Sequence, residues 1–520
     1  MIQASRTEEP NSDFQITHSS FPNPQPILPL MSATWLRQAR IISALVYIFL
    51  QITCFIFIIV CIVRFPRCQK APTTEWWMNG VILRFSNHTL KFNDLTKSLK
   101  EHKTRFNMHA IWFRPVFPLS NQSNPLGWKD IDSSLGEETD LIKLMERARD
   151  ENIRIIIDYP LNHVSIKSNY FRSYESYFVW NEQGNTSNWM TTNDNETSAW
   201  TYDKRKNSFY LHQFDNDNDS IDINYRNNRV FNDIIDSISY WNTKFHFDGY
   251  NLPGLSYAYE DYEYKNGTGN NQTRHLDEDY LLLARIRSEI DEKHILLFDS
   301  IDSLDTTDKT LLARYYGDQR KALGGVQLAS LNDYILPNET ETNLTKLFES
   351  YYHSTFYKQK QLFVWSSLSS NAILNEAFFA TCLFHTGTIS IDQQGSRLLD
   401  NQLHRLRTIM SHTRKEDIFR DGKIRQTILP GSTLLTIKRT RRGSKSYMII
   451  VNFNDSDKNA TIVDNDKPEK VEMFLNNENF CGNRSAKLRI IELKDSICLK
   501  PYGYIIIRWL PPTESLSIIF

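Results

Sequence analysis

The cysteines are the residues of this 520-residue chain whose chemistry can be judged from their surroundings alone. Cys54 and Cys61 lie in one long apolar run and are interpreted as small apolar residues, whereas Cys382 lies in another apolar run that is typical of a buried free thiol. Cys481 and Cys498 lie close together near the C-terminus, and in an oxidising compartment they are candidates for a disulfide with each other. Cys68 has no nearby mate in its polar stretch. An unpaired extracellular cysteine indicates either an intermolecular disulfide or a reactive thiol, and both alternatives stay open here.

The compartment in which these cysteines lie depends on a long apolar run. Residues 41–63, IISALVYIFLQITCFIFIIVCIV, contain no charged side chain. At ~1.5 Å per residue a helix over this run is roughly 34 Å long, which is enough to cross a hydrocarbon layer of ~30 Å. A cleaved signal peptide has a shorter apolar region that starts nearer the N-terminus. We therefore expect a transmembrane helix at 41–63.

Glycosylation signals predict the orientation of that helix, because basic residues flank it on both sides and leave the positive-inside rule undecided. Asn-x-Ser/Thr occurs only after the run, at Asn87, Asn121, Asn185, Asn195, Asn218, Asn266, Asn271, Asn338, Asn343, Asn454, Asn459 and Asn483. We expect a single-pass type II protein with its C-terminal part outside the cell. Residues 1–40, rich in Pro, Ser and Asn, are predicted to be a disordered cytosolic tail.

Beyond a neck at 64–75, short apolar runs typical of strands alternate with segments whose apolar residues have helical spacing. Short continuous apolar runs predict buried strands at 80–85, 109–113, 153–159, 245–252, 294–298, 325–329, 361–365 and 387–391. Helical spacing separates them, at 93–105, 138–152 and 276–292 among others. This rhythm predicts an α/β fold, a (β/α)8 TIM barrel over 76–410 that is interrupted by an inserted subdomain at 164–226. Alternating runs separated by turn residues predict a C-terminal antiparallel β sandwich at 411–520.

Four segments of the barrel region carry a resemblance. They are IIIDYPLNHVS at 155–165, SIDINYRN at 220–227, FDGYNLPGLSY at 247–257 and LFHTGTISIDQQG at 383–395. In this order they resemble motifs of the α-amylase-type glycoside hydrolases, whose catalytic domain is a (β/α)8 barrel. Retaining enzymes of this kind need two carboxylates about 5–5.5 Å apart, one as nucleophile and one as acid/base.

The resemblance implies that those catalytic groups are degenerate here. It places the family's arginine at Asn251, its nucleophilic aspartate at Pro253 and its acid/base glutamate at Asp299. Proline has no nucleophilic side chain, and aspartate is one methylene shorter than glutamate, so the proton donor is displaced by roughly 1 Å. Asp248 is an odd number of positions from Pro253 and should face the other side of the strand. At the seventh strand, 361–375 contains no acid and no histidine.

Asp158 and His163 match retained positions of the family, and we interpret them as hydrogen-bonding core residues. A membrane anchor on an amylase-like domain without its catalytic groups resembles the heavy-chain subunits of heteromeric amino-acid transporters. The neck, PRCQKAPTTEWW at 66–77, is similar to their membrane-proximal segment. The resemblance implies that Cys68 forms a disulfide with a multi-spanning light chain, which the heavy chain brings to the plasma membrane. The retained insertion resembles the heavy chains that pair with cystine and dibasic amino-acid transporters.

Two alternatives belong to other functional classes. A membrane-anchored α-glucosidase would use Asp158, His163 and Asp299 as the remains of a working site. A sugar-binding receptor would use the same cleft without chemistry, with Trp128 and Tyr159 as aromatic contacts. The net charge of −1 gives no indication of nucleic-acid binding, and we expect no metal or cofactor because no such motif occurs.

Overall fold

The computed structural model describes residues 33–64, 77, 80–85, 90–121, 123–182, 186–192, 196–214, 219–267, 272–290, 294–298, 342–353, 364–366, 371–385, 387–393, 398–429, 432–461, 470–481, 490–492 and 497–510. The chain divides into two compact units, residues 1–72 and 73–520, and each is described by itself.

The described part of the first unit, residues 33–64, forms the helix α1 (Ala33–Arg64). Its stretch Thr34–Val60 is long and apolar enough to cross a membrane, judged by length and composition. The helix begins eight positions before the start expected at residue 41 and takes in part of the region predicted to be disordered. The residues responsible, ATWLRQAR, include several strong helix formers and neither proline nor glycine, so nothing in them ends a helix.

The second unit is organised around a parallel sheet with the strand order β12-β11-β5-β2-β1-β14-β13. Its strands are β1 (Val81–Phe85), β2 (Ala110–Phe113), β5 (Arg154–Asp158), β11 (Gly249–Leu252), β12 (Ile295–Phe298), β13 (Val364–Ser366) and β14 (Thr388–Asp392). Seven of the eight predicted barrel strands are thereby observed, whereas 325–329 lies outside the described residues. This is the parallel sheet of a (β/α)8-type barrel.

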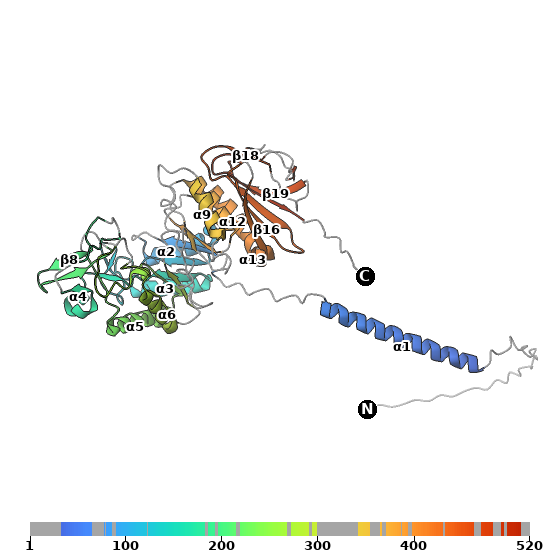
Figure 1. Ribbon diagram of the computed structural model, residues 1–520, viewed down its shortest axis with the longest axis horizontal. Coiled ribbons are helices and arrows are strands. Elements are labelled where there is room, and N and C mark those ends of the chain that lie inside the picture. Colours follow the sequence, from blue (N-terminus) through green and yellow to red (C-terminus); the bar gives the residue numbers. More distant parts are fainter. Residues whose placement is uncertain are drawn as a thin grey trace, which may run out of the picture. The chain divides into compact units, whose positions relative to one another are not determined.

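Strand alternation gives this sheet two apolar faces. Alternate side chains from four strands pack together on one face: Ile82, Ala110, Trp112, Ile156, Ile295 and Leu297. Their strand neighbours belong to the large core shared with the helices. Those helices are α2 (Phe92–Phe106), α3 (Glu138–Asp150), α5 (Asn228–Phe245), α6 (Asp277–Glu289), α9 (Thr342–His353), α11 (Ala372–Cys382) and α12 (Asp400–Lys415). Figure 1 shows α2, α3, α5 and α6 grouped in the barrel region.

The insertion after β5 folds as a small subdomain of short strands. It contains β6 (His163–Ser165), α4 (Asn169–Ser173), β7 (Trp180–Asn181), β8 (Trp200–Asp203), β9 (Ser208–Leu211) and β10 (Ser220–Asp222). The strands β7, β9 and β8 form one antiparallel sheet, while β10 pairs with β6 and returns the chain to the barrel. A separate short hairpin, β3 (Leu119–Ser120) and β4 (Asn124–Pro125), follows β2.

The C-terminal region is antiparallel. A six-stranded sheet has the order β15-β16-β17-β22-β19-β20, and β18 pairs with β21. The strands are β15 (Lys423–Ile428), β16 (Leu435–Thr440), β17 (Ser446–Val451), β18 (Lys458–Ala460), β19 (Lys470–Asn476), β20 (Ile490–Glu492), β21 (Ile497–Leu499) and β22 (Tyr504–Trp509). The boundary expected at 410 falls inside α12, and a further helix, α13 (Asp417–Asp421), precedes the first strand. The helix continues because its buried series extends through Met410 to Thr413.

Polar side chains join the barrel helices to the C-terminal sheet. Arg439 on β16 donates to the backbone oxygens of Phe384 (2.7 Å) and His385 (2.9 Å), which follow α11. Glu376 on α11 is fully buried and accepts a hydrogen bond of 2.8 Å from the Tyr504 hydroxyl on β22. These buried bonds fix the sheet against the barrel, because each would be costly to leave unmade.

Candidate functional site

Four polar or aromatic side chains converge near the carboxyl ends of neighbouring barrel strands. The strand register aligns Arg84 of β1 with Trp112 of β2, and Asp158 of β5 with Asn251 of β11. Their contacts confirm that they meet: the Arg84 guanidinium lies 4.6 Å from the centre of the Trp112 ring and 4.0 Å from the Asp158 carboxylate. This end of the sheet is where (β/α)8 enzymes keep their active sites.

Asp158 is the centre of this cluster and is fully engaged. Its Oδ1 accepts a hydrogen bond of 2.6 Å from the Trp112 indole and one of 2.7 Å from the Asn251 amide. Burial raises the pKa of Asp158 above its usual value, while Arg84 and the two hydrogen bonds oppose that shift. Asp158 is therefore a buried hydrogen-bond acceptor in this structure.

Asn251 and Pro253 lie where the resemblance puts the family's arginine and nucleophile. Asn251 is buried and its amide is directed to Asp158. Pro253 follows directly after β11 and is partly buried. The turn continues through Gly254 with a φ of +71°, and its backbone oxygen accepts from the Asn162 amide. A Cβ at Gly254 would lie 2.6 Å from that amide nitrogen, so the close approach requires glycine here.

Asp248 of the fourth-strand motif and His163 of the third-strand motif lie outside this cluster. Asp248 forms an ion pair of 2.8 Å with Arg154 and accepts from the backbone of Ile155, at the opposite end of the strands. It therefore lies away from Asp158, at the other end of the strands. His163 opens β6 and stacks on Phe214, with 5.0 Å between the ring centres.

The other candidate residues lie outside the described part of the chain or away from this cluster. Asp299 and Cys68 lie outside the described residues. Of 361–375, the structure describes β13 and residues from 371 onward. Trp128 and Tyr159, suggested as sugar contacts, are buried: the Tyr159 hydroxyl pairs with Ser237, and the Trp128 ring packs against Tyr170 at 4.9 Å. That suggestion was wrong, because apolar burial of both rings leaves neither face for a sugar.

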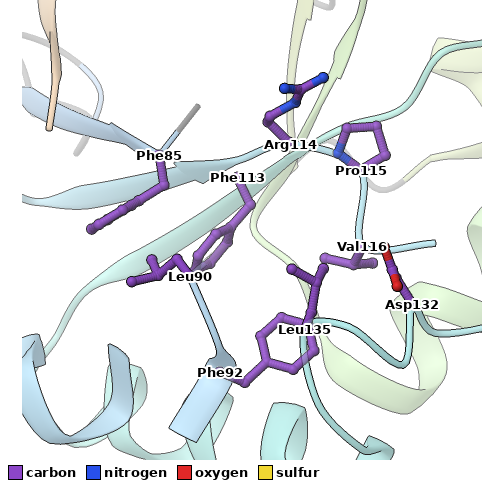
Figure 2. Close-up of a pocket in the computed structure, with 9 residues that line it drawn as sticks. All are labelled: Phe85, Leu90, Phe92, Phe113, Arg114, Pro115, Val116, Asp132 and Leu135. Atoms are coloured by element: carbon purple, nitrogen blue, oxygen red, sulfur yellow. The ribbon is translucent and has the colours of Figure 1, made fainter. Parts of the chain in front are cut away.

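A small cavity lies beside the end of β2 (Figure 2). It encloses about 20 Å³ and is lined mainly by apolar side chains, including Phe85 and Phe113. Figure 2 shows the guanidinium of Arg114 pointing away from this apolar lining. A volume of this size holds a single water molecule at most. The cavity is therefore too small for a glycoside.

Sequence reasoning did not identify a group of buried acids between the inserted subdomain and the barrel. Asp222 on β10 accepts a hydrogen bond of 2.9 Å from the Gln213 amide, and burial raises its pKa to about 7. Burial raises the pKa of Glu260 to about 7 as well, although Arg226 pairs with it. The two acids are close enough for Glu260 to raise the pKa of Asp222. Asp222 was visible only as part of a motif, whereas Glu260 stands in a tyrosine-rich run without a periodic signal.

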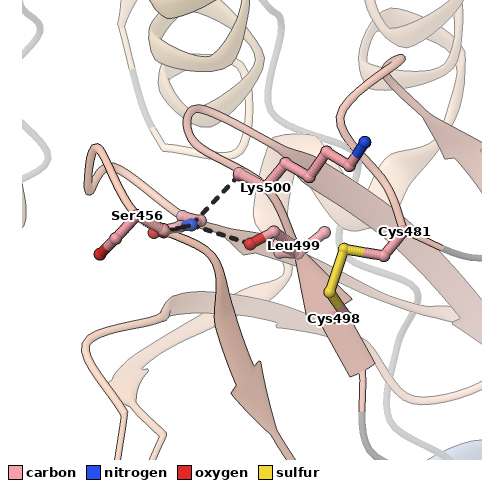
Figure 3. Close-up of a disulfide and its surroundings, with 6 residues drawn as sticks. Ser456, Cys481, Cys498, Leu499 and Lys500 are labelled. Carbon is pink, nitrogen blue, oxygen red and sulfur yellow. Dashed lines mark hydrogen bonds between the residues drawn. A yellow bond between two sulfur atoms is a disulfide. The ribbon is translucent and has the colours of Figure 1, made fainter.

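Cys481 and Cys498 form a disulfide beside the β18–β21 pair, with their Cα atoms 5.4 Å apart (Figure 3). Asp457 lies close to both sulfur atoms. A disulfide sulfur is not a thiolate, so this group is not a metal site. Of the other cysteines, Cys382 is buried, as its apolar surroundings predicted.

The glycosylation candidates divide by exposure. Asn121, Asn266 and Asn459 are exposed, whereas Asn454 is buried at 3% exposure. Asn343 lies in α9, where only its backbone is described. The others lie outside the described residues: Asn87, Asn185, Asn195, Asn218, Asn271, Asn338 and Asn483.

Comparison with known proteins identifies the fold. The catalytic-domain model of the α-amylase family matches residues 101–354. The human amino acid transporter heavy chain SLC3A1 is 26% identical over 220 residues, which are 38% of this chain and 31% of that protein. The salivary alpha-glucosidase of Aedes aegypti is 22% identical over 267 residues, 45% of each chain. This chain thus spans about a third to a half of the relatives that it matches.

Solved structures agree with the family model. The trehalose-6-phosphate hydrolase of Bacillus licheniformis superposes with a TM-score of 0.68 at 14% identity, covering 84% of this chain and all of that one. The alpha-glucosyl transfer enzyme XgtA gives a TM-score of 0.65 over the same share. At such identities the likeness concerns the fold. Together with the parallel barrel sheet and the C-terminal antiparallel sheets, these matches show that the chain has the α-amylase fold.

Proposed function

We propose that this protein is a catalytically inactive heavy chain of a heteromeric amino-acid transporter. It is a type II glycoprotein that anchors through α1, forms a disulfide with a multi-spanning light chain through Cys68, and brings that partner to the plasma membrane. The observation that carries the proposal is the site at the end of β11, where Asn251 binds Asp158 and is followed by Pro253, the residue to which the motif resemblance assigns the nucleophile position.

The chemistry of glycoside cleavage explains why this site supports inactivity. A retaining enzyme needs an ionised carboxylate positioned to attack the sugar and a second one to protonate the leaving group. Proline supplies no such group, and Asp158 is buried under hydrogen bonds from Trp112 and Asn251. Burial also raises the pKa of Asp158, because it disfavours the ionised form of the carboxyl group.

Support for the transporter role comes from the N-terminal region and the relatives. A helix long and apolar enough to cross a membrane precedes Cys68 by a few residues, which would keep that thiol near the bilayer surface. A partner cysteine must come within ~7 Å in Cα distance, so it should lie on a short extracellular loop. Among the matched relatives, SLC3A1 is itself called an amino acid transporter heavy chain.

The competing function is that of a membrane-anchored α-glucosidase, and it is favoured by relatives of similar identity that are called alpha-glucosidases. Incubating the purified full-length protein with a maltose-like substrate separates the two. We expect no hydrolysis above the level of a control preparation that lacks the protein. Measurable release of glucose would reject the proposal that the protein is catalytically inactive.

The disulfide is tested on non-reducing gels of the protein expressed with its partner. Cys68→Ser should abolish the covalent complex while leaving some noncovalent association, because helix packing and barrel contacts persist. Cys382→Ser is a matched control, since that thiol is buried. A high-mass band that survives in Cys68→Ser would mean that another cysteine forms the bond.

A further inference from the structure

Two glycosylation signals lie five positions apart after β17 and have opposite surroundings. Asn454 starts Asn-Asp-Ser and Asn459 starts Asn-Ala-Thr, so sequence makes both acceptors. We infer that Asn459 carries an N-linked glycan and that Asn454 stays unmodified in the folded protein. The inference rests on the proposed extracellular orientation, because the modification occurs only in the secretory pathway.

Asn454 is committed to the structure of its own loop. Its Nδ2 donates to the Thr433 hydroxyl and to the Asn452 side-chain oxygen, at 2.7 Å each. Its backbone nitrogen also donates to Asn452 Oδ1 at 3.0 Å. An amide nitrogen has two hydrogens, and both directions are used. At 3% exposure, there is also no room for a sugar beside it.

Asn452 extends this network to β21. Its amide donates to the backbone oxygens of Ser456 (2.8 Å), Leu499 (2.9 Å) and Lys500 (3.1 Å). Figure 3 shows these bonds on the three acceptors, close to the disulfide. The asparagine pair therefore ties the loop after β17 to the strand that contains Cys498. A chain already modified at Asn454 would have to bury the sugar or leave this loop open.

Asn459 has the opposite environment. It is the central residue of β18, is exposed, and pairs in register with Cys498 of β21. The neighbouring pairings bring Lys458 to Leu499 and Ala460 to Ile497, whose side chains are buried. Strand alternation therefore directs the Asn459 side chain away from the buried face. A glycan there is compatible with both strands.

The modification itself is an ordinary group transfer. The Asn459 Nδ2 forms a bond to the anomeric carbon of an oligosaccharide that is activated on a lipid diphosphate. The bond from that carbon to the diphosphate oxygen breaks, the lipid diphosphate leaves, and Nδ2 gives up one proton. The hydroxyl of Thr461, which is exposed, completes the acceptor signal.

The test uses the full chain expressed in eukaryotic secretory cells. Peptide N-glycanase in heavy-oxygen water converts each glycosylated asparagine to a labelled aspartate. Tryptic cleavage after Lys458 then puts the two acceptors on different peptides for mass spectrometry. We expect label at Asn459 and none at Asn454. Label at Asn454, or its absence at Asn459 when other sites are labelled, would overturn the inference.

A matched pair of variants tests the same point without altering either asparagine. Thr461→Ala removes the signal for Asn459, so the protein should run faster on a gel, with an apparent mass lower by that of one glycan. Ser456→Ala removes the signal for Asn454, leaves the backbone acceptor of Asn452 in place, and should not change mobility. The opposite result would overturn the inference. If no signal anywhere in the chain were labelled, the proposed orientation would fail, and the inference with it.

Discussion

Glu376 provides the sharpest test of how the barrel and the C-terminal sheet depend on each other. Arg405 on α12 donates two hydrogen bonds to its carboxylate, at 2.6 and 2.8 Å, and Tyr504 on β22 donates a third. Burial and the nearby carboxylate raise the pKa of Tyr504 well above its usual value, so the phenol stays a donor. Glu376 thus joins α11, α12 and the sheet through one buried charge.

Removing one member of a buried ion pair typically costs about 3–5 kcal/mol, because the other charge is left without its partner. Glu376→Ala should fall at the lower end of that range. Arg405 is 16% exposed at its side chain and lies 3.5 Å from Glu478, so part of its charge remains compensated. Tyr504→Phe removes only one bond to a charged acceptor and should cost about 1.5 kcal/mol.

Urea unfolding of the full-length protein in mild detergent, followed by tryptophan fluorescence, measures these differences as shifts in midpoint. Glu472→Gln is the matched control. Its ion pair with Arg508, at 2.7 Å, is more exposed, at 35% and 19% of the two side chains, and should contribute under about 1 kcal/mol. If Glu376→Ala lowered the midpoint no more than Glu472→Gln, the buried pair would not hold the two parts together.

Three further results are expected. Pro253→Asp should not create α-glucosidase activity, since Asn251 still holds Asp158; hydrolysis of a maltose-like substrate would refute this. Replacing Cys481 and Cys498 together by serine should lower the free energy of unfolding by about 3 kcal/mol, because the bond closes a 17-position loop; an unchanged urea midpoint would contradict it. Burial lowers the pKa of His385 from 6.5 to about 3, helped by the charge of Arg439, so the unfolded chain takes up a proton first as the pH falls. The free energy of unfolding should therefore drop by about 2 kcal/mol between pH 7 and pH 5 on account of His385. His385→Phe can keep the stacking on the ring of Phe348 and should lose that part of the pH dependence. Parallel pH profiles of the two proteins would show that His385 does not titrate on unfolding.

The sequence by itself determined the local elements of this protein. Continuous apolar runs located β1, β2 and β5 to within a residue or two, and helical spacing did the same for α2 and α3. These patterns are local, because a strand or helix buries residues that are near neighbours in the chain. The order of four motifs was enough to predict the α-amylase fold.

Only the tertiary structure decided which side chains meet. Asn251 and Asp158 are 93 positions apart, and their bond depends on the register of two parallel strands that no local pattern specifies. Asn454 and Asn459 carry the same sequence signal, yet only one is buried, because burial depends on how the loop after β17 packs against β21. Glu376 lies in an apolar helix that gives no hint of a buried charge, and its partners come from α12 and from β22, 128 positions away. Pairing and burial across such separations follow from packing, and packing is settled only when the whole chain has folded.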